Sequence, residues 1–191
     1  MAPRIVPLGP PYSAEVQASL AKWMPPGSGV QPLKIFRTIA RHEHLSARMR
    51  GLGGALLGRG TLPLRVRELL ILRTCARCGA EYEWGVHVSA FAAAAGLSDE
   101  IVAGTAQRSP ADLAETESAD DLVQRFADEL HDTHTVSERT WSSLAAHFDA
   151  NALLEMLAVV GFYHTISFIV NAARIEHEPW AATFPAPSST A

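Results

Sequence analysis

Residues 64–73 constrain the fold most, because they are apolar almost all the way round a helix and yet carry an acid. Glu68 is followed directly by Leu69, Leu70, Ile71 and Leu72. A helix that is apolar on every face is buried within a protein. A buried carboxylate is costly unless it is paired. The segment therefore predicts a central helix in which Glu68 has a partner, either a neighbouring arginine or another polar side chain.

Helical signals dominate the remaining sequence, and no run shows convincing strand alternation. The fold class predicted for the 191 residues is all-α: a single-domain helical bundle. We expect an N-terminal arm over residues 1–31, a helical domain over 32–177 and a flexible tail over 178–191. Helices are predicted at residues 13–23, 32–50, 81–95, 118–132 and 137–148, and from Asp149 or Asn151 to about residue 175, with further helices after Pro63 and Ser98. Ser98, Ser118 and Ser137 are predicted to cap the starts of three of these helices. The glycine-rich stretch 51–60 is expected to be a short helix or a loop.

Charge and composition exclude several classes of function. The net charge is −4, and no basic stripe with interleaved aromatic residues indicates nucleic-acid binding. No secretory signal is visible, and two cysteines fit a reducing cytoplasm, which is the predicted location. Residues 153–173 are nearly long enough to span a bilayer, but they contain Glu155, His164 and Asn171. We therefore expect a buried helix, no membrane partner, and a homo-oligomer that covers apolar surface.

Glu83 and His87 are four residues apart, so a helix places them on one face. A carboxylate beside an imidazole fixes its tautomer and raises its basicity. Such a pair can transfer a proton at neutral pH. The alternative is a structural hydrogen bond on a partly exposed face. A buried Glu68 nearby favours the catalytic interpretation.

Two other groups of residues invite a redox or metal interpretation. Cys75 and Cys78 have the C-x-x-C spacing of thiol redox and zinc sites, although two buried apolar residues would have the same pattern. His131 and His134 are at i, i+3, but their acidic neighbours indicate a solvated face. No metal site is predicted.

The sequence resembles the carboxymuconolactone decarboxylase family. The resemblance rests on residues 33–37 (LKIFR), 62–69 (LPLRVREL) and 81–88 (EYEWGVHV), and on 161–164 (GFYH) with Asn171. It implies an alkylhydroperoxidase D-like helical domain with a helical-hairpin core. It also implies a trimer or hexamer with sites near subunit interfaces.

The family has two chemical branches. Its alkylhydroperoxidase branch pairs a glutamate with a later C-x-x-C and a histidine four residues after the second cysteine. If that histidine is His87, the cysteine positions fall at Ala80 and Glu83. Cys75 and Cys78 lie five residues upstream, about 140° around a helix. The decarboxylase branch, like this chain, has glutamate at the second position.

The resemblance therefore implies a cofactor-independent lyase or isomerase that acts on a small unsaturated lactone or carboxylic acid. Glu68, Glu83 and His87 are the predicted catalytic residues. An arginine is expected to hold the substrate carboxylate, and Arg65, Arg67, Arg73 and Arg77 are all candidates. The predicted substrate-binding residues are Arg73, Trp84, Tyr163 and His164.

Two alternatives stay open at this point. One is a thiol-dependent peroxidase or redox protein that uses Cys75 and Cys78. The other is a non-catalytic ligand-binding oligomer in which the polar residues only fix packing.

Overall fold

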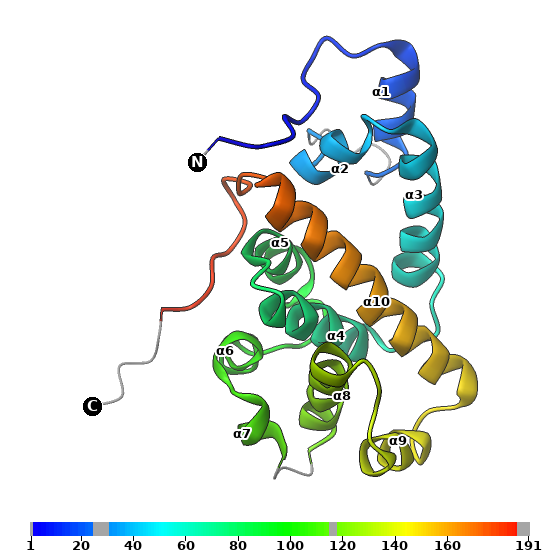
Figure 1. Cartoon of the computed structure of the whole chain (residues 1–191), viewed down its shortest axis with the longest axis vertical. Coiled ribbons are helices and arrows are strands. Elements are labelled where there is room, and N and C mark those ends of the chain that lie inside the picture. The colour runs from blue at the N-terminus through cyan, green and yellow to red at the C-terminus, as the bar shows by residue number, and fades with distance from the viewer. Residues whose placement is uncertain (1, 25–30, 115–117, 187–191) are drawn as a thin grey trace.

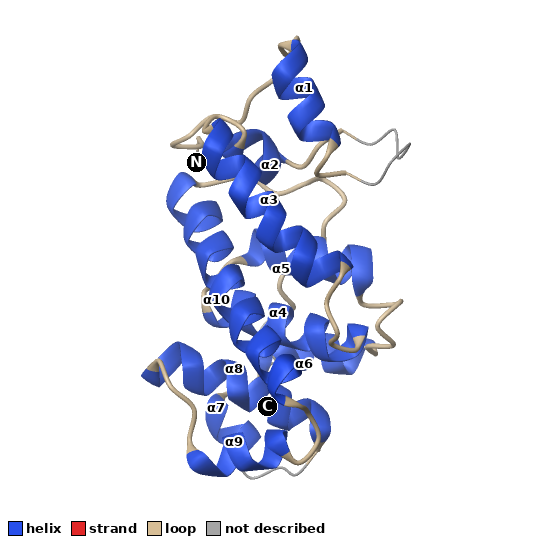
Figure 2. Ribbon diagram, turned by 90° about the vertical axis from the view of Figure 1, so that its right-hand side faces the viewer, coloured by secondary structure: helices blue, strands red, loops and turns tan. Residues whose placement is uncertain are grey.

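The structure, a computed structural model, describes residues 2–24, 31–114 and 118–186, and all regular secondary structure in those ranges is helical (Figure 2). This confirms the predicted all-α fold. The helices are α1 Ala14–Ala21, α2 Lys34–Ile39, α3 Glu43–Gly58, α4 Leu64–Arg77, α5 Glu81–Phe91, α6 Asp99–Gln107, α7 Pro110–Ala114, α8 Ala119–Thr133, α9 Glu138–Ala145 and α10 Ala150–Ala173.

Helix α4 is the central element, as its sequence predicts. It packs against α5, α6, α8 and α10, which surround it (Figure 1). Its residues Leu69, Leu70, Ile71 and Leu72 have no exposed surface. Each such side chain contributes roughly 1.5–3 kcal/mol by leaving water. The polar side chains that α4 carries into this core therefore need partners.

Side-chain caps fix where several helices begin. Ser98, Ser118 and Ser137 each accept a hydrogen bond from a backbone N–H in the first turn of α6, α8 and α9. Asp149 does the same for α10. These caps satisfy donors that a helix start leaves free. The starts predicted for these helices agree with the structure.

The prediction for residues 32–60 is wrong in detail. The expected helix over 32–50 is divided into α2 and α3, because His42 is extended and its Nδ1 accepts from Leu45 N to cap α3. Helix α3 then continues through the glycine-rich stretch to Gly58. A Cβ on Gly53 would lie 3.2 Å from the ring of Phe162. Glycine therefore allows α3 to approach α10 closely instead of breaking the helix.

Helix α10 is long and apolar enough to cross a membrane by length and composition alone. Within its most apolar window, however, half of the residues are buried inside the protein. It crosses the molecule diagonally and packs against α3, α4, α5 and α9 (Figure 1). These contacts make it a core helix of this domain.

The described parts of both terminal segments, from residue 2 and up to residue 186, pack against the helices. The N-terminal segment crosses α2 and α10, where Arg4 N donates to Ala173 O and Leu8 N donates to Arg37 O. At the other end, Phe184 N donates to Glu81 Oε1 of α5. The part of the expected tail up to residue 186 is therefore held against the domain. Residues 187–191 of that tail lie outside the described residues.

Candidate functional site

Glu68 is completely buried in α4 and has two partners. Its Oε1 accepts a hydrogen bond from Arg67 Nε at 3.0 Å, and Arg67 Nη2 lies 3.0 Å from the same oxygen. Its Oε2 lies 2.7 Å from His87 Nδ1. Because a carboxylate in the interior is costly without partners, these contacts make its burial possible.

The hairpin between α4 and α5 brings Glu68 and His87 together. Gly79 has a φ of +61°, which suits glycine, and it turns the chain from α4 into α5. On the other side of the imidazole, Nε2 lies 3.0 Å from Tyr163 Oη of α10 and 3.5 Å from Glu83 Oε1. Glu68, Glu83, His87 and Tyr163 are called the Glu–His cluster below.

The charges of the cluster set the protonation of His87. Burial alone would lower the pKa of His87, but its hydrogen bonds to Glu68 and Glu83 outweigh burial and raise the pKa to about 9. An imidazolium together with the guanidinium of Arg67 balances the two carboxylates. Burial, followed by the charges of Glu83 and Glu68, also raises the pKa of the Tyr163 phenol well above its ordinary value. The cluster therefore holds protons on His87 and Tyr163 at neutral pH.

Glu83 is the least satisfied member of the cluster. Its Oε2 is buried and has no hydrogen-bond partner among the described residues. A buried polar atom without a partner costs roughly 1–3 kcal/mol, more when it is charged. The Glu83 side chain keeps 10% of its surface exposed, against 4% for His87. The cluster thus lies just beneath the surface, with an unpaired acceptor on its outermost carboxylate.

Arg73 and Trp84, both predicted to bind substrate, are engaged elsewhere. Arg73 is 1% exposed, and its Nε and Nη2 each donate to a carboxylate oxygen of Asp128 at 2.7 Å. Its Nη1 donates to the backbone oxygens of Thr105 and Arg108. Trp84 is buried, and its Nε1 donates to Thr105 Oγ1. The structure therefore gives Arg73 a role in joining α4 to α6 and α8 rather than in binding a substrate.

Arg67 is the arginine that the structure brings to the cluster. Besides Glu68, it donates from Nη1 to Leu57 O, and its guanidinium lies 5.9 Å from the centre of the Phe91 ring. Arg65, by contrast, pairs with Asp120. The sequence named Arg67 only as one of four candidate arginines, because residues at i, i+1 do not ordinarily face each other on a helix and spacing does not single it out.

The remaining predicted residues divide between two places. Tyr163 joins the Glu–His cluster, whereas its neighbour His164 faces His131 of α8, with 3.0 Å between His164 Nε2 and His131 Nδ1. Cys75 is completely buried, and Cys78 is half-buried at the end of α4. Burial raises the pKa of both thiols, and the charge of Glu83 adds to the effect at Cys75.

Comparison with solved structures defines the class of fold as alkylhydroperoxidase D-like. A peroxidase-related protein from Silicibacter sp. TM1040 matches with a TM-score of 0.77 at 14% identity, over 97% of each chain. The alkylhydroperoxidase core protein from Ralstonia eutropha JMP134 matches with a TM-score of 0.73 at 16% identity, over 93% of this chain and 95% of that one. The debrominase Bmp8, solved in complex with 2,3,4-tribromopyrrole, matches with a TM-score of 0.69 at 14% identity, over 94% of each chain.

Within this class, residues 43–120 match the model of the carboxymuconolactone decarboxylase family. The predicted resemblance is thus confirmed. The matched region contains Glu68, Glu83 and His87, whereas Tyr163, His131 and His164 follow it in the chain. None of the curated proteins matches the sequence.

Proposed function

We propose that the protein is an enzyme that transfers a proton at the Glu–His cluster during decarboxylation or isomerisation of a small unsaturated lactone or carboxylic acid. The observation that carries this proposal is the placement of His87 between two carboxylates, one fully paired and one with a free oxygen. A purely structural pair would gain nothing from the unpartnered Glu83 Oε2, which costs free energy in the folded protein. Buried ionisable groups in such unfavourable surroundings are typical of functional sites.

Each residue has a distinct part in the proposed reaction. Glu68 accepts from His87 Nδ1 and keeps the ring oriented, so that Nε2 presents its proton toward Glu83 and Tyr163. Arg67 lies beside Glu68 and has N–H groups that its hydrogen bonds to Glu68 and Leu57 O do not use. These N–H groups suit the binding of a substrate carboxylate. A general acid of this kind contributes roughly 10²- to 10⁴-fold to the rate.

For a decarboxylation, the bond between the carboxylate carbon and the ring breaks, and carbon dioxide leaves. The electron pair enters the conjugated system as an enolate. The proton on His87 Nε2, passed directly or through Glu83, then bonds to carbon, and solvent returns one proton to the imidazole. The pKa of about 9 means that His87 carries this proton at neutral pH. The buried surroundings strengthen the electrostatic stabilisation of the enolate.

The comparisons support this proposal only in outline. The family region contains all three predicted catalytic residues. The debrominase of the same fold was solved with a small unsaturated ring, which supports a substrate of similar size. At 14% identity it does not define the substrate of this chain.

The thiol-peroxidase alternative is less well supported. A reactive cysteine needs a lowered pKa and access to its substrate. Cys75 is completely buried, and burial raises the pKa of both Cys75 and Cys78. The structural neighbours that are named as peroxidase-related share 14–16% identity with this chain, so they support the fold and not a thiol chemistry for Cys75 and Cys78.

The decisive experiment is turnover of 4-carboxymuconolactone in deuterated water, followed by NMR. We expect an enol-lactone product with deuterium at the protonated carbon, and a loss of at least about 10²-fold in Glu83→Gln. Glu100→Gln, an exposed acid at the start of α6, is the matched control and should keep full activity. Equal activity in Glu83→Gln and wild type would contradict the proposed role of Glu83. If a panel of unsaturated acids gives no turnover either, the decarboxylase interpretation fails.

A further inference from the structure

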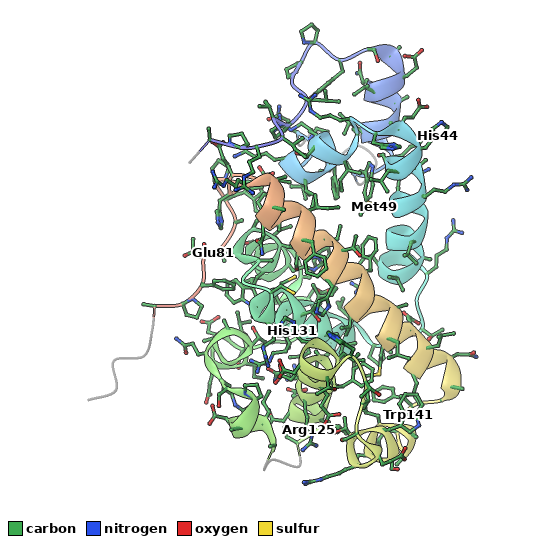
Figure 3. The ribbon with its side chains drawn as sticks, in the orientation of Figure 1. His44, Met49, Glu81, Arg125, His131 and Trp141 are labelled. Carbon is green, nitrogen blue, oxygen red and sulfur yellow. The ribbon has the colours of Figure 1, made fainter. Side chains whose placement is uncertain are left out.

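Three metal-ligating side chains from three helices converge outside the Glu–His cluster. Cys78 caps the C-terminal end of α4, His131 lies in the last turn of α8, and His164 lies in the middle of α10. Their ligand atoms all lie within 4.8 Å of one another. Figure 3 shows His131 on α8, which packs against α4, and the side chain of His131 meets His164 of α10. Positions 78, 131 and 164 are far apart in the sequence, so no spacing motif indicates that these residues meet.

The distances fit a single metal ion. His131 Nδ1 lies 3.0 Å from His164 Nε2 and 3.8 Å from Cys78 Sγ. Around a tetrahedral Zn²⁺, two nitrogen ligands are separated by about 3.3 Å, and a nitrogen and a sulfur by about 3.6 Å. Small side-chain adjustments would therefore place all three atoms at bonding distance from one ion.

Ordinary hydrogen bonds explain the arrangement less well. The Nδ1 atom of an imidazole offers one site in the plane of its ring, either a proton or a lone pair. Two groups, His164 Nε2 and Cys78 Sγ, nevertheless lie against His131 Nδ1. A cation at this point would satisfy all three atoms at once.

The surroundings hold the ligands in position. His164 Nδ1 lies 2.9 Å from Val160 O, and because a carbonyl only accepts, Nδ1 carries the proton and leaves the Nε2 lone pair facing His131. At α4, Asn171 Nδ2 donates to Cys78 O at 2.8 Å and fixes the helix end that bears the thiol. Such outer contacts orient the ligands in metal sites.

We propose that Cys78, His131 and His164 form a binding site for a borderline-soft divalent transition metal ion, with Zn²⁺ as the best fit. One thiolate and two imidazoles are the ligand types that Zn²⁺ takes in proteins. Three protein ligands leave a fourth position for water or another small donor, as in catalytic rather than structural zinc sites.

Two of the three ligands, His131 and His164, line a surface groove of about 370 Å³. The rest of the groove is lined by His134 and by apolar side chains that include Leu157 and Phe168. A small molecule with an apolar body and one oxygen or nitrogen donor suits such a groove. The site shares no residue with the Glu–His cluster, so the two proposals stand independently.

Co²⁺ binding tests this proposal, because a cobalt–thiolate bond gives a charge-transfer absorption in the near ultraviolet and tetrahedral cobalt gives intense visible bands. The full-length protein, reduced and freed of metal, is titrated with Co²⁺ and then with Zn²⁺. We expect one equivalent of Co²⁺ to produce both features and Zn²⁺ to displace it. Azide should shift the visible bands, and unshifted bands would contradict an open position.

Variants assign the ligands. Cys78→Ser should abolish the charge-transfer band, and His131→Ala and His164→Ala should each weaken Co²⁺ binding by more than about tenfold. Cys75→Ala and His44→Ala, the latter at an exposed histidine of α3, are the matched controls and should bind as wild type does. Circular dichroism confirms that each variant is folded. Loss of the band in Cys75→Ala with its retention in Cys78→Ser would overturn the proposal, and so would the absence of any thiolate band in the wild type.

Discussion

Tyr163 Oη lies 3.0 Å from His87 Nε2, although 76 positions separate the two residues in the chain. Their rings also meet edge to face, with 5.1 Å between the centroids. The contact joins α10 to the α4–α5 hairpin. It places the Tyr163 phenol beside His87 Nε2, the nitrogen that donates the proton in the proposed reaction. Burial raises the pKa of this phenol, so it stays protonated.

Tyr163→Phe should slow turnover without unfolding the protein. The change removes one hydrogen bond, worth about 0.5–1.5 kcal/mol, and keeps the aromatic packing. If the phenol orients the Nε2 proton, kcat should fall by up to about tenfold with little change in KM. Steady-state kinetics and thermal unfolding measure the two effects separately. A kcat equal to that of the wild type would mean that Tyr163 is only a packing residue.

The raised pKa of His87 predicts a characteristic dependence of stability on pH. Its ordinary pKa is 6.5, and in the folded protein the pKa is about 9. The folded state therefore binds the proton more tightly, so this contribution is complete below pH 6.5 and is lost as pH rises through 9. Between pH 6 and 8 the loss is on the order of 2 kcal/mol. Urea unfolding at several pH values in this range measures it.

Glu68→Gln is the informative variant for this pH effect. Without the Glu68 carboxylate, the pKa of His87 should fall, and the slope of stability against pH should become shallower. His44→Gln, at an exposed histidine of α3, should leave the slope unchanged. An equally steep slope in Glu68→Gln would show that His87 is not responsible.

The predicted homo-oligomer depends on apolar surface that a single chain leaves exposed. Leu154 and Phe168 of α10 keep 66% and 63% of their surface exposed. They lie 14 residues apart, close to four helical turns, and therefore on the same side of α10. We expect light scattering with size exclusion to show a trimer or hexamer, and Leu154→Glu to shift it to smaller species. His147→Glu, at an exposed position after α9, is the control. A wild type that is monomeric at all concentrations would contradict this prediction.

The sequence is most informative about features that depend on residues close together in the chain, such as helix caps and contacts within one helix. Serine caps predicted the starts of α6, α8 and α9, and the four-residue spacing predicted the approach of Glu83 to His87. The meeting of Glu68 with His87 depends on the turn at Gly79, which spacing alone does not determine. The prediction of Tyr163 as a site residue comes from the family resemblance and not from any periodicity of the sequence.

Long-range contacts explain what sequence reasoning missed. Whether a buried arginine faces a substrate or an acid depends on which helix packs beside it, and Asp128, 55 residues away, pairs with Arg73. Sequence spacing compares Cys78 with His87 and pairs His131 with His134, so it gives no indication of the three-helix group of Cys78, His131 and His164. Such groups become visible only when the packing of the helices is known.

Gly85 shows how closely the C-terminal segment follows α5. A Cβ at this position would lie 1.9 Å from the backbone oxygen of Ala182, which cannot move as a side-chain tip can. Ser89 holds the same segment, since its Oγ accepts from Ala182 N and donates to Trp180 O. Two turns of α5 thus form the surface on which residues 180–184 lie.

Gly85→Ala should therefore displace this segment, even though alanine favours the helix by roughly 1 kcal/mol. We expect a net loss of about 1–3 kcal/mol in unfolding free energy, the usual cost of overpacking. Hydrogen exchange at the amides of Ala182 and Phe184, which donate to Ser89 and Glu81, should become faster. Gly54→Ala in α3, where a Cβ meets nothing within 4 Å, should instead stabilise the protein. Unchanged exchange at both amides in Gly85→Ala would show that the segment does not lie on α5 in solution.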